Sequence, residues 1–339
     1  MKKKVLALFL IVIGIIGVVN YKKITIQQTS FKQENKYYND DVQYNSETIS
    51  KIKEINIQKE NIKNKYQFIA ITDSHISIED ENESDLKIKE TLTDRKNLYI
   101  NSNIFQKSSD VIFSDVLEYA ENRNVDSILM LGDIIDTPAD SNLSFLKNEL
   151  NELETSFLYT FGNHDWTYSW EYQTKETAQK YKPKILELMK IAESKVEKNY
   201  VKDIYIDSEV SYIEYSDLVV LAVDDGTNQI TETAIPKIEM ALNKNKPTLV
   251  MMHIPVATDY ITSQTMAKRG ASYSIGEKGV KPHNSTKKAL DIILNNLNVF
   301  YIVSGHTHFE IEDVINERIP ILVASPLYEG AITLIKINN

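Results

Sequence analysis

The sequence predicts a layered α/β fold for the body of the chain, on the strength of two observations. From residue 66 onward, short apolar runs that suit buried strands alternate with longer stretches that suit helices. Acids, amides and histidines also follow directly after several of the apolar runs, which is where ligand sites collect in layered α/β folds. A hydrophobic content of 42% is enough to form the core of such a fold.

The first element of the chain is an apolar N-terminal segment. Lysines occupy residues 2–4, and residues 5–19 then carry no polar side chain, which is the layout of a secretory signal. No small-x-small cleavage site follows, so we expect an uncleaved membrane-anchor helix over residues 1–23, with secretion after signal cleavage as the alternative. Because the first lysines favour a cytoplasmic N-terminus, we expect a single-pass protein of the cell membrane whose body lies outside.

Residues 24–65 form the second segment. They are polar, contain neither proline nor glycine, and carry few large apolar side chains. This composition is typical of a spacer or a loosely helical stalk that would hold the body away from a membrane. We therefore place the folded domain at residues 66–339.

The body contains a regular succession of expected helices and strands. Helical spacing after a serine-rich start predicts a helix over residues 108–124, and helix-like stretches also cover residues 174–195 and 285–297. Residues 256–285 form a long polar stretch with several glycines, which we interpret as a loop, either a lid or a plain surface excursion. Buried strands are expected at residues 67–72, 126–133, 157–165, 218–226, 248–255, 298–308, 319–326 and 331–337.

The histidines of the chain are concentrated in the segments that follow these strands. Five of the six lie there, and only His283 falls outside them. Histidine is not a preferred core residue, so core packing does not account for this distribution. The segments are Asp73-Ser74-His75, Gly132-Asp133-Ile134-Ile135-Asp136, Gly162-Asn163-His164-Asp165, Met252-His253-Ile254-Pro255 and Gly305-His306-Thr307-His308.

These residue types suit divalent metal ions. Carboxylates supply hard oxygen ligands, neutral imidazoles supply nitrogen ligands, and an asparagine amide oxygen coordinates without adding charge. In an extended segment, the Asp-x-His and His-x-His spacings would place both side chains on one side. Mn, Fe, Zn and Co all suit such ligands, so the identity of the metal stays open. The candidate ligands are therefore the acids, the asparagine and the histidines of these five segments.

The ordered set of motifs resembles the calcineurin-like metallophosphoesterase superfamily. The resemblance covers roughly residues 66–337 and rests on Asp-x-His, Gly-Asp-x-x-Asp, Gly-Asn-His-Asp, a single His and Gly-His-x-His. It implies a four-layer α/β/β/α sandwich, in which two mixed sheets pack face to face and helices lie outside. It also implies a centre of two divalent metal ions, with Asp73, His75 and His308 on one, Asn163, His253 and His306 on the other, and Asp133 bridging both.

The same resemblance implies a reaction on a phosphoric ester bond. A hydroxide shared by the two metal ions would attack phosphorus without a covalent enzyme intermediate. His164 would stand beside the metals without binding them and would assist the leaving group, with Asp165 orienting it. Asp136 would accept a hydrogen bond from a ligand or a backbone group. The implied enzyme is a hydrolase, either a phosphatase or a phosphodiesterase.

Two features narrow the substrate class. Protein serine/threonine phosphatases carry Gly-Asp-x-x-Asp-Arg-Gly and Gly-Asn-His-Glu, whereas here Thr137 follows Asp136 and Asp165 follows His164. A net charge of −10 disfavours a surface that wraps nucleic acid. A phosphate-ester small molecule, a lipid or a cell-wall substrate suits an outward-facing body better. Monoester and diester both stay open, as does the oligomeric state.

The alternative hypothesis is a catalytically inactive, membrane-tethered binding or scaffold protein on the same fold. Such a protein would be expected to lack one or more ligands, and all of them are present here. Some weaker features could either line the site or simply pack or turn the chain. They are Asp224-Asp225-Gly226, the polar residues Lys268, Arg269 and His283, and the aromatic residues Trp166, Tyr168 and Trp170.

Overall fold

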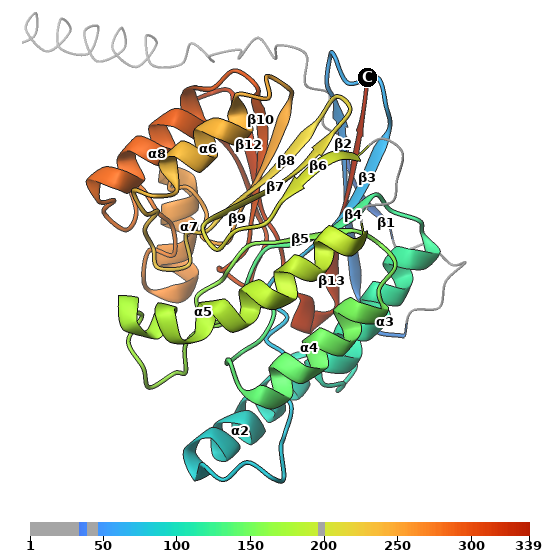
Figure 1. The fold of residues 1–339 in the computed structure, drawn as a ribbon, viewed down its shortest axis with the longest axis vertical. Helices are drawn as coiled ribbons and strands as arrows, with labels where there is room; N and C mark the ends of the chain where they lie inside the picture. Colours follow the sequence, from blue (N-terminus) through green and yellow to red (C-terminus); the bar gives the residue numbers. More distant parts are fainter. Residues whose placement is uncertain (1–33, 39–46, 196–200) are drawn as a thin grey trace, which may run out of the picture. The chain divides into compact units, whose positions relative to one another are not determined.

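The computed structural model describes residues 34–38, 47–195 and 201–339, the first of these as backbone only. Two β-sheets and their helices form the mixed α/β fold expected from the sequence (Figure 1). The membrane-anchor helix expected at residues 1–23 lies outside the described residues. Within the described ranges, none of the helices has the length and apolar character needed to cross a membrane.

Both sheets are mixed, and each contains a run of parallel strands. The first sheet has the order β1 (Glu34–Tyr38), β2 (Lys51–Gln58), β13 (Ala331–Asn338), β3 (Tyr66–Ile71), β4 (Ser127–Met130) and β5 (Phe157–Tyr159). The second has the order β11 (Ile311–Ile315), β12 (Ile319–Val323), β10 (Val299–Ser304), β9 (Thr248–Met252), β8 (Val219–Val223), β7 (Val210–Tyr215) and β6 (Val201–Tyr205). β3, β4 and β5 are parallel, as are β8, β9, β10 and β12. The carboxyl ends of parallel strands gather their loops at one edge of a sheet.

Helices occupy both sides of this pair of sheets in Figure 1, with α6 and α8 on one side and α3, α4 and α5 on the other. Ile238 of α6 and Leu290 of α8 join an apolar cluster with residues of the second sheet. The helices expected from the sequence at residues 108–124, 174–195 and 285–297 are confirmed as α3, α5 with η1, and α8. The helical elements are α2 (Leu86–Ser102), α3 (Ser109–Asn122), α4 (Asp140–Glu152), α5 (Lys175–Met189), α6 (Ile235–Leu242), α7 (Asp259–Arg269), α8 (Asn284–Asn295) and the 3-10 turns η1 (Lys190–Lys195) and η2 (Leu327–Glu329).

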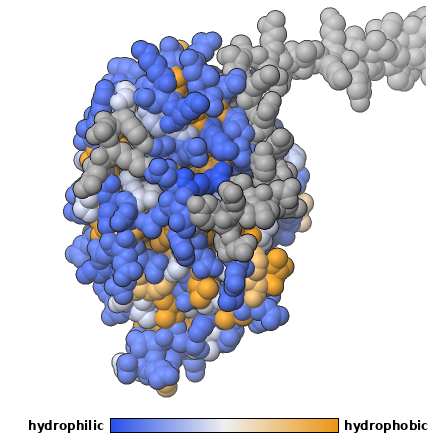
Figure 2. Space-filling model, turned by 90° about the vertical axis from the view of Figure 1, so that its right-hand side faces the viewer, coloured by the Kyte–Doolittle hydropathy of each residue, from blue (hydrophilic) through white to orange (hydrophobic). Residues whose placement is uncertain are grey.

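The two sheets meet through buried aromatic side chains. Tyr66 and Phe68 of β3 lie with ring centroids 5.1 and 5.8 Å from that of Tyr215 in β7. The Tyr215 hydroxyl lies 2.7 Å from Oγ of Ser127 in β4. These four residues are buried, so apolar packing joins the sheets while the buried hydroxyl groups stay paired. The face of the molecule shown in Figure 2 is mainly hydrophilic, with apolar residues in small groups.

The structure differs from the spacer expected at residues 24–65, because part of this segment is a strand of the first sheet. Lys51–Gln58 form β2, which pairs in parallel with β13 and antiparallel with β1. Ile55 and Ile57 are buried on either side of the partly exposed Asn56. Over residues 55–58 the burial alternates with the period of a strand, and the polar composition of the whole segment concealed this element. The folded domain therefore begins before residue 66.

The polar stretch at residues 256–285 contains a helix and is not a single loop. The N-cap of α7 is Thr258, whose hydroxyl accepts a hydrogen bond from the N–H of Ile261 at 3.0 Å. Gly270 ends the helix with a φ of 75°, in the left-handed region that favours glycine. Because α7 buries only Ile261 and Thr265, it lacks the apolar stripe from which a helix is usually recognised.

Candidate metal centre

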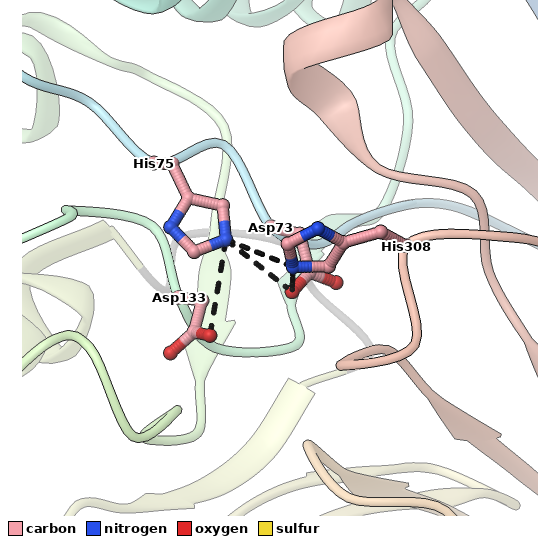
Figure 3. Close-up of side chains that lie close together, drawn as sticks. All are labelled: Asp73, His75, Asp133 and His308. Carbon is pink, nitrogen blue, oxygen red and sulfur yellow. Dashed lines mark hydrogen bonds and ion pairs between the residues drawn. The ribbon is translucent and has the colours of Figure 1, made fainter. Parts of the chain in front are cut away.

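Two overlapping groups of acids and histidines lie on the loops that leave the parallel strands. The first contains Asp73, His75, Asp133 and His308, each offering a ligand atom within 4.8 Å of the others (Figure 3). Nε2 of His308 lies 3.1 Å from Nε2 of His75 and 3.2 Å from Oδ1 of Asp73. Oδ2 of Asp133 lies 3.9 Å from Nε2 of His75. Four potential ligand atoms thus converge on one point.

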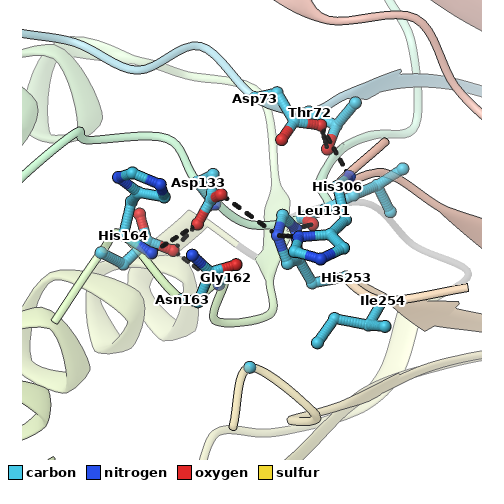
Figure 4. A network of polar contacts seen from close by, with 12 residues as sticks. Thr72, Asp73, Leu131, Asp133, Gly162, Asn163, His164, His253, Ile254 and His306 are labelled. Carbon is cyan, nitrogen blue, oxygen red and sulfur yellow. Dashed lines mark hydrogen bonds and ion pairs between the residues drawn. The ribbon is translucent and has the colours of Figure 1, made fainter. Parts of the chain in front are cut away.

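The second group contains Asp133, His253 and His306. Nε2 of His253 lies 3.2 Å from Oδ2 of Asp133 and 3.2 Å from Nδ1 of His306. Figure 4 places Asn163 close to these side chains, on the loop that follows β5. Because Oδ2 of Asp133 faces both groups, this carboxylate is placed to serve two cations at once. All of the expected ligands other than Asn163 belong to one of the two groups.

The unpaired polar atoms of these groups fit bound cations. Oδ1 of Asp73 and Oδ1 of Asn163 are buried, and neither accepts a hydrogen bond from the part of the chain that the structure describes. Leaving a buried polar atom without a partner costs on the order of 1–3 kcal/mol. Imidazole nitrogens of neighbouring histidines also face each other, and a cation bound between them would suit this arrangement better than a hydrogen bond. The donor set is therefore that of a divalent metal site built from carboxylate, amide and imidazole ligands.

Three of the imidazole rings are oriented by polar contacts on the nitrogen that faces away from the centre. Nδ1 of His75 lies 2.9 Å from Oδ1 of Asp136, so Asp136 contacts the imidazole of an expected ligand. Nδ1 of His253 donates to the carbonyl oxygen of Leu131 at 2.8 Å. Nδ1 of His308 lies 3.3 Å from the Tyr328 hydroxyl. Each contact leaves Nε2 directed at the centre, which is how hydrogen-bonded neighbours fix metal-binding histidines.

The ligand loops are not extended, contrary to the geometry expected for the Asp-x-His and His-x-His spacings. Several ligand residues have a positive φ, which is uncommon for any residue other than glycine and costs roughly 1–2 kcal/mol per residue. These tight left-handed turns, and not strand alternation, bring each pair of side chains together. The residues are Asp73 (50°), His75 (49°), Asp133 (52°), His306 (71°) and His308 (58°).

Two buried carboxylates hold the ligand loops from behind. Asp165 accepts hydrogen bonds from the N–H groups of Gly162 at 2.7 Å and Asp133 at 3.0 Å. Asp225 accepts one from the N–H of His253 at 3.0 Å. Gly162 lies so close to Asp133 that a Cβ there would collide with its carboxylate. The expected pairing of Asp165 with His164 is therefore wrong, since the Asp165 oxygens bind backbone donors and the Tyr159 hydroxyl.

His164 faces Asp136 in place of Asp165. Its Nδ1 lies 3.3 Å from the backbone oxygen of Asp136 and 3.4 Å from Oδ1 of the same residue. Its backbone N–H donates to Oδ1 of Asp133 at 2.7 Å, so the imidazole is carried directly beside the shared carboxylate. The His164 side chain is 30% exposed and thus accessible to a ligand.

The profile of the calcineurin-like phosphoesterase family matches residues 66–310, which is most of the chain. The protein belongs to this family. The match contains all of the expected ligands and ends two residues after His308. The β2 strand and β13 lie outside it, although both are part of the first sheet.

Three of the solved structures that this chain is similar to are the following. A dimetal phosphatase from Danio rerio is 13% identical, over 78% of this chain and 88% of that one, with a TM-score of 0.47. A 5′-nucleotidase from Candida albicans is 15% identical, over 79% and 47%, with a TM-score of 0.38. A purple acid phosphatase from yellow lupin is 10% identical, over 83% and 46%, with a TM-score of 0.42. This chain thus spans about half of the latter two chains, and no curated protein matches it.

The buried charges of the candidate site shift one another's pKa values. Burial lowers the pKa of His253, but the nearby carboxylates of Asp133, Asp73 and Asp225 together outweigh burial and raise that pKa to about 10. Burial, together with the neighbouring His253, lowers the pKa of His306 to about 3. Burial raises the pKa of Asp133, yet the adjacent histidines hold it below its usual value. The carboxylate therefore stays ionised at neutral pH and provides negative charge for cations.

Of the residues that the sequence offers as weaker candidates for lining the site, Arg269 lies near it, whereas His283 and Trp166 lie elsewhere. The Arg269 guanidinium lies 5.8 Å from the ring of Tyr273, which in turn lies 5.3 Å from the ring of His306. His283 lies elsewhere, as the exposed N-cap residue of α8. Trp166 is fully buried and packs in the core.

Sequence reasoning missed Arg95 and Tyr99 of α2, which bind Asp136. Nε of Arg95 donates to Oδ2 of Asp136 at 2.7 Å, and the Tyr99 hydroxyl donates to Oδ1 at 2.8 Å. A spacing of four residues places both side chains on one face of α2. Nothing in the sequence around them marks their partner, because Asp136 lies on a distant loop.

Proposed function

We propose that the protein is a hydrolase that cleaves a phosphate ester with the help of two divalent metal ions. The observation that carries this proposal is the sharing of Asp133 between two ligand groups, beside unpaired oxygens of Asp73 and Asn163. Membership of the calcineurin-like phosphoesterase family supports hydrolysis of a phosphoric ester. The two sheets with helices outside would form the four-layer α/β/β/α sandwich that carries the site.

The ligands divide into two sets that share one carboxylate. Cations bound there would place positive charge against the phosphoryl oxygens and would lower the pKa of an attacking water. Mn, Fe, Zn or a similar metal suits these ligands. Asp73, His75 and His308 would hold one cation, Asn163, His253 and His306 the other, and Asp133 both.

His164 would give its proton to the leaving oxygen of the ester. Nδ1 faces Asp136, which directs Nε2 away from that carboxylate and makes it available to a substrate. The amide nitrogen of Asn163 would donate a hydrogen bond to a phosphoryl oxygen as charge develops. Asp165 would act only by holding the loops of Gly162 and Asp133 in place.

We propose a phosphate-ester small molecule, a lipid or a cell-wall component as the substrate. The net charge of −10 supports this class over nucleic acid. The apolar segment at residues 5–19 would anchor the chain as a single-pass membrane protein with the phosphoesterase domain outside. A substrate of the outer membrane face or of the cell wall would then be within its reach.

The experiment that tests the proposed activity is hydrolysis of p-nitrophenyl phosphate and of bis-p-nitrophenyl phosphate by chelator-treated protein. We expect turnover after Mn²⁺ is added and no turnover before. Comparison of the two substrates separates monoesterase from diesterase activity. The wild-type protein is compared with His164→Ala in the presence of Mn²⁺, Zn²⁺, Fe²⁺ or Co²⁺. If it hydrolyses neither substrate faster than this variant with any of these ions, an inactive scaffold would be favoured.

A further inference from the structure

The Asp136 carboxylate lies behind two residues of the candidate site. Oδ1 is 2.9 Å from Nδ1 of His75 and 3.4 Å from Nδ1 of His164. His75 directs its other nitrogen at the first ligand group, and His164 stands beside the shared Asp133. The orientation of this single carboxylate therefore sets the orientation of a proposed ligand and of the proposed proton donor.

Arg95 holds this carboxylate with a two-pronged contact. Nε donates to Oδ2 of Asp136 at 2.7 Å, and Nη2 donates to Oδ1 at 2.7 Å. Paired parallel hydrogen bonds between a guanidinium and a carboxylate are the strongest and most directional contacts that these groups make. Asp136 is buried and the Arg95 side chain is 27% exposed, so water competes little for the pair.

Tyr99 completes the contact from the next turn of α2. Its hydroxyl donates to Oδ1 of Asp136 at 2.8 Å and accepts from Nη2 of Arg95 at 2.6 Å. The guanidinium carbon also lies 5.2 Å from the Tyr99 ring. The ring stacks against that of His75 with centroids 4.9 Å apart. Arg95 and Tyr99 thus fix both oxygens of Asp136 and one face of His75.

Charge gives a second reason for an arginine at this position. His75, Asp136 and His164 offer ligand atoms close enough to bind a cation of their own. The Arg95 guanidinium occupies the Asp136 oxygens and brings a positive charge beside them, so it opposes a cation there. The carboxylates of Asp73 and Asp133 are left as the sites for metal.

We propose that Arg95, supported by Tyr99, is a positioning residue of the phosphoesterase site, which holds Asp136 and through it orients His75 and His164. This inference rests on the proposed function, since it assigns a role within the same site. Loss of a residue behind a metal ligand typically lowers metal affinity or activity by about 10–100-fold. Arg95 would act on cation binding through His75 and on turnover through His164.

The test compares full-length Arg95→Gln, Arg95→Lys and Tyr99→Phe with the wild-type protein. Lys96→Gln is a matched control, because Lys96 lies on the same helix and pairs at 2.7 Å with Glu79, away from Asp136. Binding of Mn²⁺ to the metal-free protein is measured by calorimetry, and kcat and KM are measured with p-nitrophenyl phosphate. Circular dichroism establishes that each variant is folded, and only folded variants are compared.

We expect Arg95→Gln to weaken Mn²⁺ binding and to lower kcat, each by about 10-fold or more, with little change in KM. Arg95→Lys should recover part of the loss, because lysine keeps the charge without the two-pronged contact. Tyr99→Phe should show a smaller loss, and Lys96→Gln should match the wild type.

Unchanged Mn²⁺ affinity and unchanged kcat in folded Arg95→Gln would overturn the inference. A rise in KM at constant kcat would also overturn it, since Arg95 would then bind substrate directly. If the wild-type protein binds Mn²⁺ but hydrolyses neither aryl ester, the proposed function fails. The calorimetric comparison still decides the role of Arg95 in that case.

Discussion

The carboxylate of Asp165 accepts a hydrogen bond from the backbone N–H of Asp133, with an N–O distance of 3.0 Å. The same carboxylate binds the N–H groups of Ile134 at 2.9 Å and Gly162 at 2.7 Å. It therefore joins the loop after β4, which carries the shared carboxylate, to the loop after β5, which carries Asn163 and His164. The Asp225 carboxylate likewise accepts a hydrogen bond from the backbone N–H of His253.

Replacement of Asp165 by asparagine should loosen both loops. The amide has one acceptor oxygen and would direct an NH₂ group at backbone donors, so buried N–H groups would lose their partners. We expect Asp165→Asn to lower the free energy of unfolding by on the order of 2 kcal/mol and to weaken cation binding. Chemical denaturation and Mn²⁺ calorimetry would measure the two effects.

Asp140→Asn provides the matched control for Asp165→Asn. The Asp140 side chain is 84% exposed and pairs only at the surface, with Lys184 at 3.1 Å. We expect this variant to unfold and to bind Mn²⁺ like the wild type. Equal stability and equal affinity for Asp165→Asn and Asp140→Asn would contradict the role given to Asp165.

His164 and His253 should respond differently to replacement by alanine. His253 belongs to a ligand group, so His253→Ala should lower bound metal as well as turnover. His164 is the proposed proton donor and not a proposed metal ligand, so His164→Ala should keep its metal and lose roughly 10²–10⁴-fold in kcat. Metal analysis beside steady-state kinetics measures both. A His164→Ala variant that loses its metal would show that this residue is a ligand.

Much of the site was predictable because its residues follow buried strands. The apolar runs before Asp73, Asp133 and His253 marked the strand ends, and parallel strands bring such ends to one edge. The histidine distribution then indicated candidate ligands, since imidazoles rarely serve as core residues, and the structure brings these side chains together.

The contacts behind the ligands were not predictable from the sequence. Asp165 binds backbone N–H groups, and every residue except proline carries such a group, so no sequence pattern marks its partners. Because His164 is adjacent in sequence, it was the expected partner of Asp165, but its imidazole faces Asp136. Arg95 reaches Asp136 from a helix whose polar face resembles any solvated surface.

The β2 strand gives a prediction about where the domain can be cut. A chain that begins at residue 66 would lack β2, which buries Ile55 and Ile57 and pairs with β13 over its whole length. We expect it to be less stable by on the order of 5 kcal/mol than a chain that begins at residue 47 and keeps β2. Thermal unfolding of the two chains tests this, and equal midpoints would contradict the place of β2 in the fold.

Asp217 should make stability depend on pH at the contact between the sheets. The Tyr66 hydroxyl donates to its carboxylate, and the N–H of Lys63 donates to Oδ2 at 2.6 Å. Burial raises the pKa of Asp217, but these hydrogen bonds outweigh burial and hold the pKa below its usual value. The stabilisation is therefore present above the carboxyl pKa of the unfolded chain and is lost as pH falls through the lower pKa of the folded chain.

We accordingly expect Asp217→Asn to lower the free energy of unfolding by about 1 kcal/mol at pH 7. The difference from the wild type should shrink as acid protonates Asp217. Urea unfolding of both proteins at pH 7 and at progressively lower pH measures it. A difference that grows on acidification would have the wrong sign for a lowered carboxyl pKa.

The metal content of the purified protein tests the central claim most directly. The wild-type protein is loaded with Mn²⁺, freed of excess metal by gel filtration and analysed by plasma mass spectrometry, beside His253→Ala. Two ligand groups that share Asp133 predict about two Mn²⁺ per wild-type chain and fewer in the variant. A wild-type protein that retains no metal, or as little as His253→Ala, would contradict the proposed two-metal site.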